Sequence, residues 1–175
     1  MATAATGKDI KLGFLTVIEM ADRGFMGGLL VTTLTGRPLE FQCTTPVQPN
    51  KTQQILYGTT LGPFIKGELI AKTLLERVQI KPVAILVDQL DILGLRNHID
   101  TPVAVLKTDD TTGKPNDAEH AKRNHNRNEL YALKAFSEDL AIIAEMLKGI
   151  PAEADLGEPL YRTNEALRET LKTAA

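Results

Sequence analysis

The pattern of apolar and polar positions predicts strands and helices that follow one another along the chain. Apolar residues recur at three- and four-residue steps over residues 62–78, which predicts a helix with one buried stripe. Pro63 suits the first turn of that helix. The next two apolar runs, 83–88 and 102–107, are short and rich in valine, as in strands covered on both faces. Residues 91–100 predict a short helical connector, so these strands should be parallel neighbours.

The N-terminal third predicts three strands in a meander. Residues 12–20 are almost continuously apolar, which is typical of a central strand, although a buried helix has the same pattern. Residues 21–28 contain three glycines and should turn the chain. A second strand is predicted over 29–34, and a turn at Thr-Gly-Arg-Pro leads into a third at 39–45. In the third strand apolar and polar residues alternate, so one of its sides should face water.

Two further helices are predicted, one short and one long. Asn50 is a suitable N-cap for a short helix that ends before Gly58. Apolar positions from Asn128 to Leu147 predict a long helix that ends at Gly149 and Pro151.

Three other segments are predicted to be mobile or peripheral. Residues 1–10 carry no periodic pattern and should be mobile, and the polar segment 108–124 predicts a mobile surface loop. Residues 159–173 predict a peripheral C-terminal helix with a sparse apolar side.

This order of elements defines the predicted fold class. An antiparallel three-strand meander followed by parallel strands, with helices on both faces, is an α/β mixed sheet of the ribonuclease H-like order. The chain has 175 residues, of which 43% are hydrophobic, and this fits one domain, 1–175, with a sizeable core. No internal repeat divides it.

Composition predicts the cellular compartment of the protein and bears on the partners that it can bind. No apolar run reaches the ~20 residues that span a bilayer, and the N-terminus lacks a secretion signal, so we expect a cytoplasmic protein without membrane contact. Cys43 is the one cysteine and cannot form an internal disulfide. The net charge of -2 gives no overall electrostatic support for nucleic acid binding.

The polar residues that follow the two parallel strands mark a candidate site. Both strands should end on one sheet edge, which places Asp88, Asp91 and Lys107 around the crevice where open α/β sheets hold ligands. In a purely structural interpretation, Asp88 caps the connector helix and Asp91 stabilises its first turn. Residues 22–28 could cradle a phosphate through backbone N–H groups, but they match no phosphate-binding fingerprint and favour a tight turn.

The sequences FIKGELIAKTLL, LVDQ and TPVAVLK resemble a helix and two strands of endonuclease V-type nucleases. The resemblance implies that Glu68, Asp88 and Lys107 surround a metal-bound phosphate. These nucleases also carry an Asp in the first strand, where this chain has Glu19 near the end of the run. In this interpretation Glu19, Glu68 and Asp88 bind Mg²⁺ or Mn²⁺, and Lys107 holds the phosphate.

Other residues favour structural roles. The three histidines are dispersed and lack zinc-site spacing. Cys43 lies on the apolar side of its strand, where a cysteine packs as a small hydrophobe. The basic run 122–127 contains no aromatic residue that could stack on bases. A further stretch, GRPLEFQCTTPVQPNKTQQILYG, resembles an uncharacterised bacterial family without an assigned activity.

Two function classes follow from the sequence. The first is a non-catalytic binding or assembly domain that binds a protein partner or associates with itself through the C-terminal helix, with no cofactor, because no catalytic set is complete. The alternative is a divalent-metal-dependent nuclease or phosphodiesterase of the ribonuclease H-like type, which would bind nucleic acid.

Overall fold

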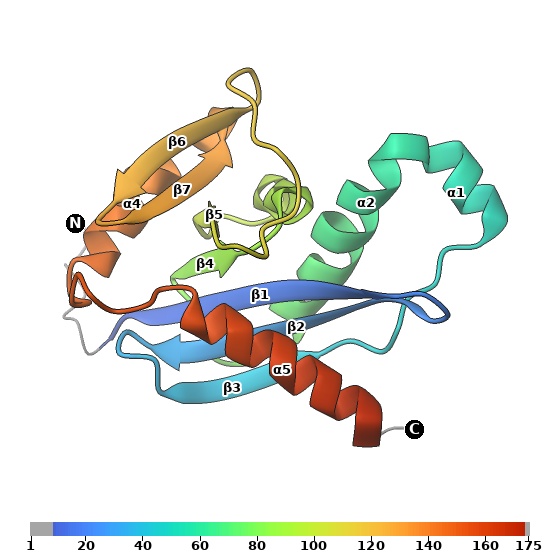
Figure 1. Ribbon diagram of the computed structural model, residues 1–175, viewed down its shortest axis with the longest axis horizontal. Coiled ribbons are helices and arrows are strands. Elements are labelled where there is room, and N and C mark those ends of the chain that lie inside the picture. The colour runs from blue at the N-terminus through green and yellow to red at the C-terminus, as the bar shows by residue number, and fades with distance from the viewer. Residues whose placement is uncertain (1–8, 174–175) are drawn as a thin grey trace.

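A seven-stranded mixed sheet organises the chain, seen here in a computed structural model that describes residues 9–173 (Figure 1). The strand order is β3-β2-β1-β4-β5-β7-β6. The strands are β1 (Lys11–Met20), β2 (Gly24–Thr33), β3 (Pro38–Cys43), β4 (Ala84–Val87), β5 (Val103–Leu106), β6 (His120–His125) and β7 (Asn128–Leu133). β1, β2 and β3 pair antiparallel, whereas β4 runs parallel to both β1 and β5. The predicted fold class and the predicted parallel pair are confirmed.

Helices cover both faces of this sheet. The helical segments are α1 (Lys51–Tyr57), η1 (Gly58–Thr60), α2 (Leu61–Pro63), the π-helix η2 (Phe64–Ala71), α3 (Lys72–Arg77), η3 (Leu90–His98), η4 (Lys134–Phe136), α4 (Glu138–Leu147) and α5 (Glu158–Thr173). The core on one face joins the sheet to η2, α3 and η3, and the core on the other face joins it to α4 and the start of α5. No helix among residues 9–173 is long and apolar enough to cross a membrane.

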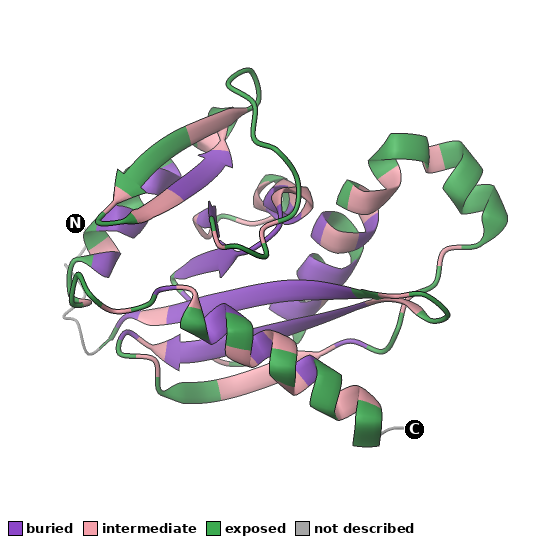
Figure 2. Cartoon of the chain, viewed as in Figure 1, coloured by how far each residue is buried: buried purple, intermediate pink, exposed green. Residues whose placement is uncertain are grey.

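The strand β1 is buried on both faces, as its continuous apolar run predicts (Figure 2). Leu15 and Val17 belong to the core beneath η2 and α3, whereas Leu12 and Phe14 belong to the core beneath α4. Thr16 has the same parity as Leu12 and Phe14, so its side chain points to the face that α4 and α5 cover. The hydroxyl of Thr16 therefore needs a partner inside the protein.

The strand β2 begins at Gly24, five residues earlier than the sequence predicts. Gly27 and Gly28 are part of this strand rather than of a turn, because helices approach it from both sides. A Cβ atom on Gly27 would lie 2.2 Å from the side chain of Ile70, and one on Gly28 would lie 2.9 Å from that of Leu167. The glycines thus serve close packing and do not form a phosphate cradle.

The long helix predicted from Asn128 is wrong in its first part. Residues 128–133 form β7, which pairs antiparallel with β5 and with β6, and the helix α4 begins only at Glu138. The apolar spacing there fits either period, and pairing with the free edge of β5 decides in favour of a strand. Residues 120–124, predicted as part of a loop, belong to β6, so the irregular segment ends at Glu119. Its mobility stays a prediction.

The two chain ends differ from the sequence-based expectation. Of the predicted mobile start, residues 1–8 lie outside the described part, and Ile10 is buried. The C-terminal helix is α5, which lies across β1 and β2 rather than at the periphery (Figure 1). Its side chains Leu160 and Leu167 are buried, and Leu171 packs against the small cluster of Ile18, Met26 and Leu167. The apolar side that suggested a partner is therefore covered within the chain, and self-association through this helix stays untested.

Replacement of Leu86 by Ala should test the buried sheet directly. Leu86 is fully buried in β4, so its truncation should lower the free energy of unfolding by about 2–5 kcal/mol. The matched substitution Leu56→Ala, at a side chain that is 77% exposed, should change it by less than about 0.5 kcal/mol. Equal losses in chemical denaturation would contradict the burial of β4.

Candidate functional site

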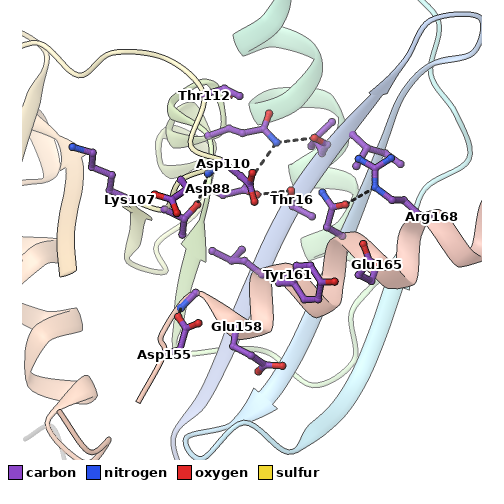
Figure 3. A pocket seen from close by; sticks show the side chains of 18 of the residues that line it. Thr16, Asp88, Lys107, Asp110, Thr112, Asp155, Glu158, Tyr161, Glu165 and Arg168 are labelled. Atoms are coloured by element: carbon purple, nitrogen blue, oxygen red, sulfur yellow. Dashed lines mark hydrogen bonds between the residues drawn. The ribbon is translucent and has the colours of Figure 1, made fainter. Parts of the chain in front are cut away.

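A cavity of about 820 Å³ opens at the sheet edge where β1, β4 and β5 end (Figure 3). Strands β1 and β4 bring Thr16, Glu19 and Asp88 to it, the loop after β5 contributes residues 107–110 and Thr112, and α5 forms the opposite wall. The isolated bridge between Gln89 and Thr112 holds the loop beside the end of β4. This is the edge at which open α/β sheets usually bind ligands.

Asp88 lies at the inner end of the cavity and is 7% exposed. The hydroxyl of Thr16 donates a hydrogen bond of 2.8 Å to its Oδ2 atom. The side-chain amide of Gln89 approaches its other oxygen at 3.4 Å and donates a 2.6 Å hydrogen bond to the carbonyl of Val17. Burial raises the pKa of the Asp88 carboxyl, against the lowering effect of the hydrogen bond from Thr16.

Thr16 reaches Asp88 because β1 and β4 run side by side. Leu15 is paired with Val87, so the next residue of each strand follows at the same level. The middle of β1 therefore presents a neutral hydroxyl to the carboxylate of Asp88, which directly follows β4. Thr16 is fully buried and its hydroxyl is directed to one fixed acceptor.

Of the other predicted site residues, only some line the cavity. Glu19 lines the cavity from the exposed end of β1, three residues beyond Thr16. Lys107 also lines it, but its ammonium group is bound to Glu129 on β7 at 3.0 Å. Glu68 is not among the lining residues and approaches the imidazole of His98 at 3.8 Å. Asp88, Glu19 and Lys107 thus share the cavity and Glu68 does not.

The π-helix η2 places Lys66 at the cavity instead of Glu68. The ammonium group of Lys66 lies 3.4 Å from the carboxylate of Asp91, and its side chain is 15% exposed. Gly67 of the same helix packs on the backbone of η3, where a Cβ atom would lie 2.8 Å from the Asp91 carbonyl. This close contact fixes which side of the helix faces the cavity, and a cation lies there.

Lys107 belongs to a small charged cluster at the side of the cavity. Glu129 accepts hydrogen bonds from Lys107, Lys122 and the Tyr131 hydroxyl, each at 3.0 Å. These donors, Lys107 first, lower the pKa of the Glu129 carboxyl to about 2. Lys107 is therefore engaged by a carboxylate that stays ionised at neutral pH.

The wall formed by α5 was missed at the sequence level. Tyr161, Asn164, Glu165 and Arg168 line the cavity from one side of this helix, and the Arg168 guanidinium donates to Asn164 at 2.8 Å (Figure 3). Their spacing of three, four and seven residues is the signature of one helix face and could have revealed a shared polar surface.

The charges around the cavity are mostly negative. Seven acidic residues line it, and three basic residues do. The acidic residues are Glu19, Asp88, Asp109, Asp110, Asp155, Glu158 and Glu165, and the basic ones are Lys66, Lys107 and Arg168. Within residues 9–173, however, no group of three or more His, Cys, Asp or Glu side chains is arranged to hold a metal ion.

Comparison with solved structures supports the ribonuclease H-like fold class. Endonuclease V of Ciona intestinalis, in complex with DNA that contains an inosine, matches 94% of this chain and 86% of its own, with a TM-score of 0.53 and 13% identity. Two structures of the Marinitoga piezophila Argonaute with guide RNA match about 30% of their own length, with TM-scores of 0.42 and 0.39 at 14% and 11% identity. No family model and no curated protein matches the sequence. The likeness defines the ribonuclease H-like fold and leaves the activity to the site itself.

The raised pKa of Asp88 predicts a pH dependence of stability. The folded protein holds the Asp88 proton more tightly than the unfolded chain, so this residue's contribution to stability falls as pH rises from the ordinary aspartate range through the raised pKa. Asp88→Asn removes this titration and still offers an oxygen to Thr16. The variant should therefore gain stability relative to the wild type as pH rises from 3 to 7 in thermal unfolding.

Asp139→Asn is the matched control for that experiment. Asp139 is fully buried, but it forms an ion pair of 2.8 Å with Arg96 and accepts a hydrogen bond from the backbone N–H of Val103. Loss of its charge should destabilise the protein at neutral pH. If Asp88→Asn loses as much stability at pH 7 as Asp139→Asn, the carboxylate of Asp88 is stabilised in the fold and the account of its pKa is wrong.

Proposed function

We propose that this chain is a non-catalytic binding or assembly domain built on the ribonuclease H-like fold. The observation that carries the proposal is the hydrogen bond from Thr16 in β1 to Asp88, which follows β4. A two-metal phosphoryl transfer site needs several carboxylates that converge from different elements. Here a buried hydroxyl group from β1 occupies the position beside Asp88.

The donor set does not fit the divalent metal site that nucleases of this fold imply. Mg²⁺ and Mn²⁺ prefer charged oxygen ligands, but Glu68 lies outside the cavity and η2 presents Lys66 there. Asp88 is already held by Thr16, and Glu19 lies at the exposed strand end. Of the metal ligands suggested by the resemblance, only Glu19 and Asp88 reach the cavity.

The charge of the cavity supports a ligand other than a phosphate backbone. Nucleic acid binding relies on Lys and Arg side chains that replace condensed counterions. Lys66 and Lys107 are each paired with a carboxylate, and the lining acids outnumber the lining bases seven to three. A neutral or positively charged group, such as a segment of a protein partner, is therefore the occupant that we propose.

The alternative is a divalent-metal-dependent nuclease or phosphodiesterase. Glu19, Asp88 and Lys107 line one cavity, and the fold is shared with endonuclease V, which favours this alternative. It would require Glu68 to move from its place near His98, and Lys107 to exchange Glu129 for a phosphate.

Metal titration of the wild type and of a variant with an added carboxylate tests the binding-domain proposal against the nuclease alternative. Millimolar Mg²⁺ or Mn²⁺ should leave the melting temperature of the wild type unchanged, and single- or double-stranded substrates should stay intact. Thr16→Asp places a second carboxylate beside Asp88, so this variant should be destabilised without metal. Mn²⁺ should restore part of that loss, since metal at 100-fold excess over its Kd stabilises a protein by about 2.7 kcal/mol.

Thr32→Asp provides the control, because Thr32 is also a fully buried strand threonine, with its hydroxyl bonded to the backbone of Thr33. It should be destabilised and gain nothing from Mn²⁺. Metal-dependent cleavage by the wild type that Asp88→Asn abolishes would sink the proposal in favour of the nuclease. A wild-type melting temperature raised by Mn²⁺, but not in Asp88→Asn, would count against it as well.

A further inference from the structure

The helix α1 is a protruding arm that buries none of its own residues (Figures 1 and 2). Ile55 and Leu56, which are 70% and 77% exposed, are the two most exposed large apolar side chains within residues 9–173. They lie next to each other near the end of this helix. We call residues 46–62 the α1 arm.

The α1 arm is held in a defined conformation despite this exposure. Asn50 and Gln53 form a reciprocal capping box, and the ring of Tyr57 stacks on Phe64 at a centroid distance of 4.4 Å. Isolated helices shorter than about 12–15 residues are marginal in water, and most helical stability in proteins comes from a packed apolar face. A seven-residue helix with a free apolar end is thus suited to packing against another surface.

An apolar groove of about 340 Å³ lies at the opposite end of the sheet. The start of β1, the turn between β2 and β3, and the linker between α4 and α5 form it. Its accessible apolar lining comes from Ile150, Pro151 and Ala154, and the buried side chains of Leu12, Phe14 and Leu34 lie beneath them.

The arm and the groove of one chain are too far apart to meet. The arm leaves the sheet after Val47, which is bridged to Phe25 near the end of β1, whereas the groove adjoins the start of β1. Phe25 pairs with Glu19, which lies seven residues along β1 from Leu12 of the groove, a separation of roughly 23 Å. Figure 1 shows α1 and the turn between β2 and β3 on opposite sides of the molecule. Any contact between the two surfaces must therefore join two molecules.

The charges of the two surfaces are complementary. The α1 arm includes Lys51 and no acidic residue. Lys51 precedes Ile55 by one helical turn and lies on the same face. The groove carries Asp155 and Glu158 at its border, with Arg162 bound to Glu158 and to the carbonyl of Gly36. Docking of Ile55 and Leu56 would bring Lys51 toward these carboxylates.

We propose that the α1 arm of one molecule docks into the apolar groove of a second copy of this chain. Each molecule has one arm and one groove, so the association is head-to-tail and continues into open chains unless a rotation closes it. The buried area is small, so the contact is weak and depends on concentration. The inference rests on the assembly part of the proposed function and is independent of the metal chemistry of the cleft.

Sedimentation velocity of the full chain from about 10 μM to 1 mM tests this proposal. The wild type should show a rising weight-average sedimentation coefficient, and high salt should reduce it. Ile55→Ser with Leu56→Ser, which removes the apolar end of the arm, should stay monomeric. Ala154→Trp, which fills the groove, should do the same. Ile142→Ser, at a 42% exposed side chain on α4, should assemble like the wild type.

A mixture of the two non-assembling variants provides the decisive test. The arm variant keeps an intact groove and the groove variant keeps an intact arm, so together they should form a discrete 1:1 dimer and no longer chains. Thermal unfolding of each variant verifies that it is folded. A wild type that stays monomeric up to 1 mM overturns the proposal, as does a mixture that fails to dimerise or an equal effect of Ile142→Ser. None of these outcomes changes the result of the metal titration.

Discussion

The burial of β1 on both faces is the constraint on which the rest of the structure depends. A strand without a wet side needs paired neighbours and a helical layer above and below it. β2 and β4 supply the pairing, and η2 with α3 on one side and α5 on the other supply the layers. The helices come this close because Gly27 and Gly28 leave space for Ile70 and Leu167.

The burial of β1 also explains why the polar residue Thr16 within it needs a hydrogen-bond partner. A hydroxyl in a fully buried strand must be satisfied, and Thr16 is satisfied by Asp88. That hydrogen bond joins β1 to the residue that follows β4, and it occupies part of the carboxylate that a metal would require. The cavity thus lies at the sheet edge where open α/β sheets usually hold ligands, with a neutral hydroxyl beside Asp88 at its inner end.

Most of the fold could be predicted from sequence because continuous apolar runs have few structural solutions. The runs at 83–88 and 102–107 could hardly be anything but buried parallel strands, and Asn50 carries the capping signal that the structure confirms. The hairpin β6–β7 could not be predicted, since Leu130 and Leu133 fit a helix as well as a strand. Its strands are fixed by pairing with β5, which is a tertiary effect.

Only part of the candidate site could be predicted from the sequence, because the rest depends on tertiary packing. Asp88 and Lys107 follow buried strands, so their position at one edge could be inferred from topology. Thr16 carries no signal, because a threonine in an apolar run is common in strands. The orientation of Glu68 depends on the π-helical winding of η2, and that winding depends on packing against η3.

We propose that Thr16 holds Asp88 in a cleft that binds no catalytic metal. A crystal structure of the protein soaked in Mn²⁺, with anomalous diffraction data, measures this most directly. The account predicts no anomalous peak beside Asp88 and a hydrogen bond near 2.8 Å between Thr16 and Asp88. A manganese peak at about 2.2 Å from the Asp88 carboxylate, with the Thr16 hydroxyl turned away, would contradict it.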